Sequence, residues 1–289
     1  MIGPAVDVEL TSIEPLWRRL KRSRVGMVGA VTLTVMALLA FFGPAVLNDD
    51  PASFVDARLR PPSRSYLMGT DDLGRDVFIR FVHGAKSSLL VGLIAALMGM
   101  VIGILVGAIA GFFGSYLDAT LMRITEIFQL MPRFILALAV IALLGPGFLK
   151  VIFVIGILSW PPLARVVRAE FLTLREQAFV EAATSVGMRP LRIIFSEILP
   201  NAMPAVIVLA SFEVAHAILL ETGLSFLGLG DANVISWGTM LNEAQRYLNN
   251  GWWMAVFPGL GIFSLVLAFN LLGDGINDAQ NPRLQQDTK

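Results

Sequence analysis

The sequence predicts an all-α polytopic membrane protein with six transmembrane helices. The chain of 289 residues is 56% hydrophobic and only 15% charged, and its mean hydropathy is +0.72. Soluble domains usually carry about 25% charged residues, so this chain lacks the charge to cover itself in water. Its apolar residues also gather in runs of about 20, the length that crosses a bilayer as a helix.

Six apolar runs are long enough to be membrane spans, and backbone groups in hydrocarbon must bond internally, so each is expected to be helical. They cover about residues 25–47, 88–113, 119–144, 148–163, 200–220 and 252–272. Proline in the third and sixth runs permits a kink without demanding one. The resulting division is an N-terminal tail (1–24), a first helix (25–47), a segment with an elbow (48–87), a five-helix core (88–272) and a C-terminal tail (273–289).

Basic residues indicate which side of the membrane each segment occupies. Two segments each hold five of them: Arg18, Arg19, Lys21, Arg22 and Arg24 before the first span, and Arg165, Arg168, Arg175, Arg189 and Arg192 before the fifth. With six spans, both segments and the C-terminus lie on one side, which is expected to be cytoplasmic. The segment 49–86 does not follow this rule, because it holds six basic residues although it is expected on the outer side.

Four glycines in the second span are spaced four residues apart and so share one helical face. They are Gly99, Gly103, Gly107 and Gly111. Small residues let a second backbone approach closely in lipid, so this face is expected to pack against another helix. That helix could belong to this chain or to another subunit.

The segment 174–199 predicts a helix, a turn and a second helix outside the membrane. Apolar residues at helical spacing are Phe179, Ala182, Ala183 and Val186. Gly187 can take the left-handed conformation that ends a helix, and Pro190 suits the first turn of the next one. The exposed stripe has no lipid to face, so it indicates a protein partner; an ordinary amphipathic loop is the alternative.

Within this segment, Glu181-Ala182-Ala183, Gly187 and Leu199-Pro200 resemble the EAA loop of ABC importer permeases. The family pattern places Ile where this chain has Glu197, and here Ile198 stands one position later. In that family the helix before the glycine docks on the ATPase subunit and transmits its closure. The resemblance implies coupling roles for Glu181, Ala182, Ala183 and Gly187, with apolar contacts from Phe179 and Val186.

Further motifs, in the same order, resemble the second permease subunit of the dipeptide/oligopeptide/nickel family. They are Gly69-Thr70-Asp71-Asp72-Leu73-Gly74-Arg75-Asp76, Gly223-Leu224-Ser225-Phe226-Leu227-Gly228-Leu229-Gly230, Ser236-Trp237-Gly238, Met240-Leu241, Asn270-Leu271-Leu272-Gly273-Asp274-Gly275, Asp278 and Asn281-Pro282-Arg283. Together they extend the resemblance from about residue 17 to residue 283. The stretch 231–235 lacks the proline that the family often has between two of these motifs.

The resemblance implies a type I ABC importer permease fold in a bacterial cytoplasmic membrane, with both termini cytoplasmic. It implies three kinds of partner besides membrane lipid: a homologous permease, two ATP-binding subunits, and an extracytoplasmic solute-binding protein. ATP and Mg would be bound by the ATP-binding subunits. This chain itself would bind no cofactor and no nucleic acid. The cargo would be short peptides, or a small solute such as a nickel complex, moved by alternating access. The alternative is a stand-alone secondary transporter or channel.

Charges inside the expected spans are costly in lipid and so call for an explanation. They are Glu126, Arg133, Glu213, His216 and Glu221. Glu126 and Arg133 are seven residues apart and are expected to share a helical face. One interpretation is a polar translocation path along a subunit interface; the other is a set of charge pairs that lock helices together.

The dense charges Asp71, Asp72, Arg75 and Asp76 predict a salt-bridged elbow that leads into the second span. The chain has no cysteine and only two histidines, so zinc or thiol chemistry has little support. Gly228-Leu229-Gly230-Asp231 matches an intramembrane aspartyl protease motif, but no Tyr-Asp pair supplies a second aspartate. No full phosphate-binding loop is present either, so the chain is not expected to be an enzyme.

Overall fold

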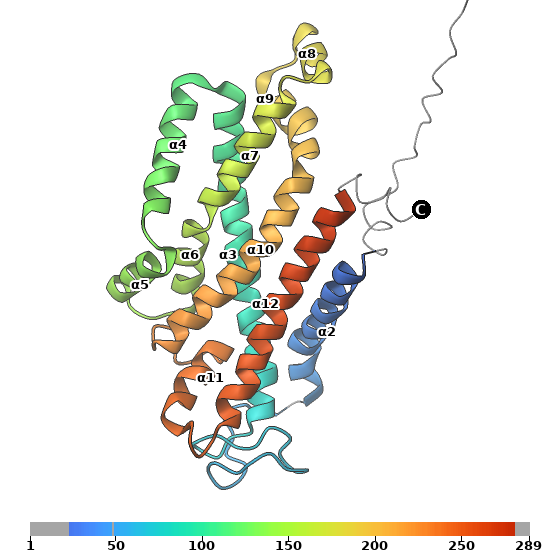
Figure 1. Ribbon diagram of the computed structural model, residues 1–289. Coiled ribbons are helices and arrows are strands. Elements are labelled where there is room, and N and C mark those ends of the chain that lie inside the picture. Colours follow the sequence, from blue (N-terminus) through green and yellow to red (C-terminus); the bar gives the residue numbers. More distant parts are fainter. Residues whose placement is uncertain (1–22, 48, 281–289) are drawn as a thin grey trace, which may run out of the picture.

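The computed structural model describes residues 23–47 and 49–280 as a bundle of long helices (Figure 1). In chain order the helices are α2 (Arg24–Leu47), α3 (Val77–Phe113), α4 (Ser115–Leu130), α5 (Arg133–Leu144), α6 (Phe148–Leu158), α7 (Trp160–Leu174), α8 (Ala178–Ser185), α9 (Pro190–Arg192), a π-helical turn (Ile193–Ile198), α10 (Leu199–Phe226), α11 (Trp237–Ala244), a 3₁₀ turn (Gln245–Tyr247) and α12 (Trp253–Gln280). Five of these segments are long and apolar enough to span a membrane, or six if the bent pair α4–α5 is one span. The predicted all-α polytopic class is confirmed.

The third expected span is not one helix. It is divided into α4 and α5, which meet at an angle of 82°. Pro132 has no N–H to donate to a continuing helix, and the residue before a proline is driven toward an extended conformation. Met131 accordingly has φ −94° and ψ 136°. Glu126 and Arg133 therefore lie on two differently directed helices, and the expectation that they share a face is wrong.

Several helices extend beyond the spans expected from hydropathy. α3 begins at Val77 rather than at residue 88, because Asp76 caps it by accepting the Phe78 N–H at 2.7 Å. The fourth span continues through Ser159 to Leu174, and α12 reaches Gln280 rather than 272. The first part of the expected C-terminal tail is thus helical. The rest of that tail, with Asn281, Pro282 and Arg283, lies outside the described residues, as do Arg18, Arg19, Lys21 and Arg22.

The glycine face of α3 lies against Ser159 and α7 of the same chain. A Cβ added at Gly99 would stand 2.8 Å from the Ser159 Cβ, and one at Gly103 would stand 2.6 Å from the Leu163 Cβ. Gly111 has the same relationship to Phe171, at 2.6 Å, and Gly107 lies equally close to the α7 backbone. Only a residue without a side chain allows two helix backbones to approach this closely.

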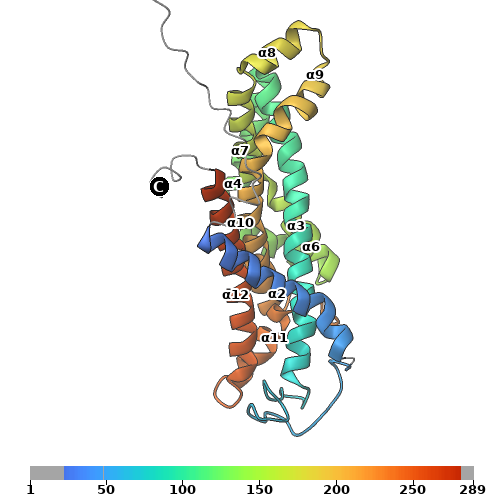
Figure 2. The same ribbon diagram turned by 90° about the vertical axis from the view of Figure 1, so that its right-hand side faces the viewer.

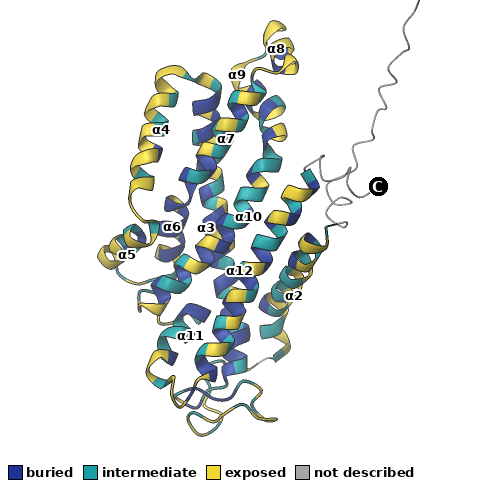
Figure 3. Ribbon diagram, viewed as in Figure 1, coloured by how far each residue is buried: buried dark blue, intermediate teal, exposed yellow. Residues whose placement is uncertain are grey.

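Helix α2 crosses the outside of the bundle, lying over α12 and the first part of α3 (Figure 2). Gly29 and Gly43 make the closest approaches, to the α12 backbone and to Val82. The outward surface of α2 is apolar and exposed, as is most of α5. Helix α4 is also exposed but mixes apolar residues with Arg123 and Glu126, whereas α3 is more buried (Figure 3). Exposed apolar helices of this kind suit a lipid environment or a second membrane subunit.

Candidate functional site

Helix α8 stands out at one end of the bundle and is ended by Gly187 (Figure 1). Gly187 has φ +77°, its N–H bonds to the Thr184 carbonyl at 3.0 Å, and the Met188 N–H bonds to the Ala183 carbonyl at 3.1 Å. This pair of bonds is the Schellman ending, which needs a left-handed residue. The turn ends α8 and redirects the chain into α9.

The two faces of α8 have different surroundings. Val180 and Ala183 are 4% and 9% exposed and pack on the cluster that contains the π-helical turn. Phe179 is 40% exposed and Val186 79%, and Glu181 and Ala182 are exposed beside them. The sequence-based placement of Ala183 on the exposed stripe is therefore wrong, because this residue turns toward the bundle. The exposed surface consists of Phe179, Glu181, Ala182 and Val186.

The chain from α9 onward is one uninterrupted helical segment. It runs from Pro190 through the π-helical turn into α10 and ends at Phe226, a length of 37 residues. Pro190 begins it at the position where a missing N–H costs nothing. The other end of the bundle is therefore joined by a continuous helix to the loop that carries α8.

An ion pair connects the bend between α4 and α5 to the middle of α10. Arg133, the first residue of α5, donates hydrogen bonds to both carboxylate oxygens of Glu213 at 2.8 Å and 3.3 Å. The Glu213 side chain is 4% exposed and that of Arg133 26%. A buried carboxylate in a membrane segment needs such a partner, and a two-bond pairing with arginine is a strong form of it.

The other three charged candidates lie apart from this pair. Glu126 is exposed and pairs with Arg123 at 3.0 Å. His216 is exposed, with Nδ1 3.0 Å from the Phe212 carbonyl of its own helix. Glu221 is buried against α11, where its Oε1 accepts hydrogen bonds from Ser225 and Ser236, each at 2.8 Å. Of the five, only Arg133 and Glu213 are brought together.

The elbow before α3 is a network of ion pairs, and sequence reasoning missed two of its members. The Asp71 carboxylate accepts hydrogen bonds from Arg75 Nε at 2.6 Å and from Arg80 Nη1 at 2.5 Å. Arg80 also pairs with Glu243 of α11 at 2.8 Å. Arg80 could have been found as the lone arginine within an apolar run, but Glu243 is 163 residues away and gave no signal. Asp71, Asp72 and Glu243 gather acidic oxygens within 4.8 Å. The guanidinium groups of Arg75 and Arg80 already pair with these carboxylates.

The pKa of Asp71 lies below its ordinary value. Burial raises this pKa, but the backbone hydrogen bond from Arg75 and the positive charges of Arg80 and Arg75 together lower it by more. These interactions all favour the ionised carboxylate. The elbow is therefore an anion held between two cations at the end of the bundle opposite α8.

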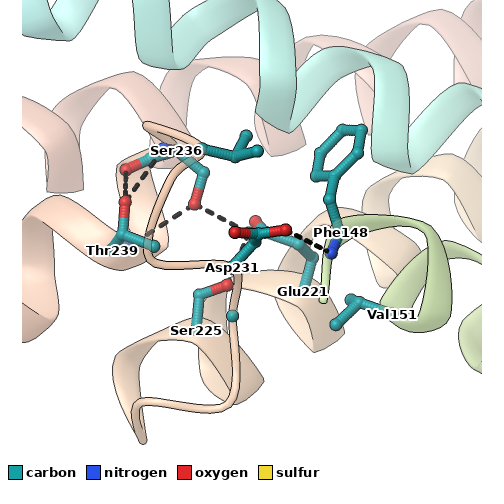
Figure 4. Close-up of a pocket in the computed structure, with 9 residues that line it drawn as sticks. Phe148, Val151, Glu221, Ser225, Asp231, Ser236 and Thr239 are labelled. Atoms are coloured by element: carbon teal, nitrogen blue, oxygen red, sulfur yellow. Dashed lines mark hydrogen bonds between the residues drawn. The ribbon is translucent and has the colours of Figure 1, made fainter. Parts of the chain in front are cut away.

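A second polar group at that end surrounds Glu221 and the loop before α11 (Figure 4). Ser236 caps α11 by accepting the Thr239 N–H at 3.2 Å, and Thr239 Oγ1 accepts the Ser236 N–H at 2.9 Å. Asp231 accepts the N–H of Phe148, the first residue of α6, at 3.2 Å. The pKa of Asp231 lies below its ordinary value because backbone N–H groups of Asn233 and Phe148 bond to it. These contacts join α6, α10 and α11.

A polytopic helical bundle with a short helix projecting beyond one end, one face of it exposed, is the form expected of a membrane component of a larger assembly. The chain matches the family described as "Binding-protein-dependent transport system inner membrane component" over residues 103–286. It also matches "N-terminal TM domain of oligopeptide transport permease C" over residues 15–62. The chain belongs to this family of ABC importer permeases. Such a subunit is the membrane component and not the ATPase, so the alternative of a stand-alone transporter falls away.

Curated relatives agree with this membership, and a solved structure shares the fold. The chain is 38% identical to the dipeptide transport system permease protein of Alkalihalophilus pseudofirmus, over 98% of this chain and 95% of that protein. It is also 38% identical to the di/tripeptide transport system permease protein of Pseudomonas aeruginosa, over 98% and 97%. An inward-facing methionine ABC transporter has the same fold, with a TM-score of 0.58, 21% identity, and coverage of 71% of this chain and 98% of that one.

Proposed function

We propose that this chain is one of two permease subunits of an ATP-driven importer of short peptides. The named cargo of its relatives supports this: dipeptides, di/tripeptides and, for a protein 38% identical from Escherichia coli, glutathione. The observation that carries the proposal is the exposed surface of α8, which presents Phe179 and Val186 beside Glu181 without a partner among the described residues. An apolar helix face of this kind is the usual form of a helix that enters a groove on another protein.

The partners in this proposal are a homologous permease, two ATP-binding subunits and an extracytoplasmic solute-binding protein. ATP and Mg bind to the ATPases. When the two ATPases close, each moves its docked α8, and the continuous helix that follows α8 carries the movement into α10. Residues 88–272 form the transport core, and α2 is an addition on its outside.

The proposed orientation places α8 and both ends of the chain in the cytoplasm, with the segment 49–76 and α11 outside. The basic residues Arg165, Arg168, Arg175, Arg189 and Arg192, close to α8, support it. The chain contains no cysteine, so single cysteines can report sidedness directly. We expect Ser63→Cys to react with an impermeant maleimide in intact cells and Glu176→Cys only after permeabilisation. The reverse pattern would overturn the orientation.

The proposed translocation path runs along α10 between the two permeases. It uses the Arg133–Glu213 pair and the exposed imidazole of His216, with Glu126 at a more exposed position on α4. A peptide carries a charge at each end, and a paired arginine and carboxylate can exchange partners with both. Glu221 belongs to the separate polar group beside α11.

The experiment that tests the assignment is reconstitution of the complete transporter, with its partner permease, ATPases and binding protein, in proteoliposomes. We expect Phe179→Ala to reduce ATP-dependent peptide uptake by roughly tenfold or more, because interface energy is concentrated in buried aromatic residues. Phe42→Ala, at a 63% exposed position on α2, is the matched control and should transport normally. Normal uptake by the Phe179→Ala transporter would contradict the docking role of α8.

A further inference from the structure

A small cavity lies beside the carboxylate of Glu221 at the end of the bundle opposite α8 (Figure 4). Glu221 is only 3% exposed. Its Oε1 receives two hydroxyl hydrogen bonds, but its buried Oε2 has no hydrogen-bond partner among the described residues. A carboxylate oxygen removed from water without a compensating partner is strongly unfavourable. Glu221 lines the small cavity, which is therefore the place to look for that partner.

The cavity is lined by oxygen atoms on one side and apolar groups on the other. Besides Glu221, its polar lining comes from Ser225, Asp231, Ser236 and Thr239. The Asp231 carboxylate oxygens accept hydrogen bonds from the backbone N–H groups of Asn233 and Phe148, at 2.9 Å and 3.2 Å. These oxygens keep further lone pairs that can accept a ligand. The volume is about 10 Å³, which admits one water or one small ion without a hydration shell.

No basic side chain is bonded to this pair of carboxylates within the described part of the chain. Arg80 does not line the small cavity and is already paired with Asp71 and Glu243. It borders a larger polar cavity of about 190 Å³ that also touches Ser225 and Asp231. The two cavities share Ser225 and Asp231 in their linings, so they adjoin each other.

We propose that Glu221 and Asp231, with the hydroxyls of Ser225 and Ser236, bind one dehydrated monovalent cation, Na⁺ by preference. Two carboxylates and hydroxyl oxygens form a hard oxygen set, which suits a hard cation. Mg²⁺ keeps several waters, for which the cavity has no room, and Ca²⁺ takes 6–8 oxygens, more than these side chains have free. The ion would cross-link α10, the N-cap of α11 and, through Asp231, the start of α6.

The direct test is equilibrium binding of radioactive Na⁺ to the purified full-length chain in nanodiscs, with choline chloride maintaining ionic strength. We expect saturable binding of about one Na⁺ per chain, accompanied by a rise in the thermal unfolding midpoint that choline does not produce. Absence of both effects would overturn the proposal. A Ca²⁺ response at much lower concentration without a Na⁺ response would replace the monovalent assignment and so also overturn it.

Variants locate the site. Glu221→Gln should abolish Na⁺ binding, and Ser225→Ala, which keeps both carboxylates, should weaken it roughly tenfold. Glu176→Gln, at an exposed carboxylate near α8, should bind Na⁺ as the wild type does. If Glu221→Gln retains full Na⁺ binding, the site is elsewhere. If the unfolding midpoint of the wild type responds to pH but not to Na⁺, a proton compensates Glu221 and the cation site does not exist.

Discussion

The guanidinium of Arg133 bonds to both carboxylate oxygens of Glu213 across 80 residues of sequence, with nitrogen–oxygen distances of 2.8 Å and 3.3 Å. The pairing depends on the 82° bend at Met131 and Pro132, which makes Arg133 the first residue of a new helix. In a straight third span, Arg133 would lie inside one long helix and not at the start of a second one. The bend thus sets where one of the few charges within the membrane segments is placed.

Removing one member of this pair should lower the free energy of unfolding more than removing both members does. We expect Arg133→Met to lower the free energy of unfolding by about 3 kcal/mol, because it leaves the Glu213 carboxylate buried and unpaired. The double variant Arg133→Met/Glu213→Leu should recover most of that loss in thermal unfolding of the purified chain. If the pair lines the translocation path, the double variant will be stable but inactive in peptide uptake. Normal uptake would instead mean that the pair only locks helices.

Gly187→Val should separate ATP hydrolysis from transport. An added Cβ at Gly187 meets nothing within 4 Å, so the effect of valine comes from the φ of +77° alone. A left-handed conformation costs an ordinary residue about 1–2 kcal/mol, which is enough to displace the end of α8. We expect reconstituted transporters with this variant to hydrolyse ATP without substrate-stimulated uptake.

The control for this variant is Gly187→Asn, because asparagine tolerates the left-handed conformation. It should retain coupled transport. Equal losses of coupled transport in both variants would show that position 187 requires glycine because of contact with a partner and not because of its backbone conformation.

Gly103→Ala should destabilise the chain, because its Cβ would stand 2.6 Å from the Leu163 Cβ. Overpacking of a close helix contact costs about 1–3 kcal/mol. Gly259→Ala, in α12, is the matched control, because its Cβ meets nothing within 4 Å. We expect the control to unfold at the wild-type temperature or slightly above it. Comparable unfolding temperatures in the two variants would contradict the packing role of the α3 glycines.

The elbow at Asp71 should make stability depend on acid pH. Because the folded-state pKa of Asp71 is below its unfolded value, its contribution is present above the unfolded pKa and is lost as pH falls through the folded one. We expect the free energy of unfolding to fall between about pH 5 and pH 2 and Asp71→Asn to be less sensitive over that range. Asp278→Asn, at an exposed position, should keep the wild-type slope. If Asp71→Asn keeps the wild-type dependence of the free energy of unfolding on pH, the Asp71 carboxylate is not the cause of the acid sensitivity.

The sequence was sufficient for the fold class, because apolar runs of membrane length are visible in the local order of residues. It also located the end of α8, since Gly187 and Pro190 are local signals. It placed the ends of the spans poorly, because Asp76 caps α3 well before the apolar run becomes continuous, and α12 continues into polar residues.

The parts that depend on distant contacts could not be predicted. Arg80 and Glu243 are paired across 163 residues, and no local pattern marks such a partner. The burial of Ala183 likewise depends on a neighbouring turn, because periodicity alone does not distinguish the two faces of a helix only 8 residues long. The unsatisfied oxygen of Glu221 required the positions of Ser225 and Ser236 to be known.

The uninterrupted segment from Pro190 to Phe226 is long enough to serve as a lever between the two ends of the bundle. Its 37 residues span about 55 Å at the helical rise per residue. A tilt of about 10° around its midpoint would shift each end by about 5 Å in opposite directions, given that length. The π-helical turn lies near one end, so most of the rod beyond it is ordinary α-helix. If the segment tilts as one body about its midpoint, a displacement of the loop that carries α8 appears, reversed in direction, beside Glu221.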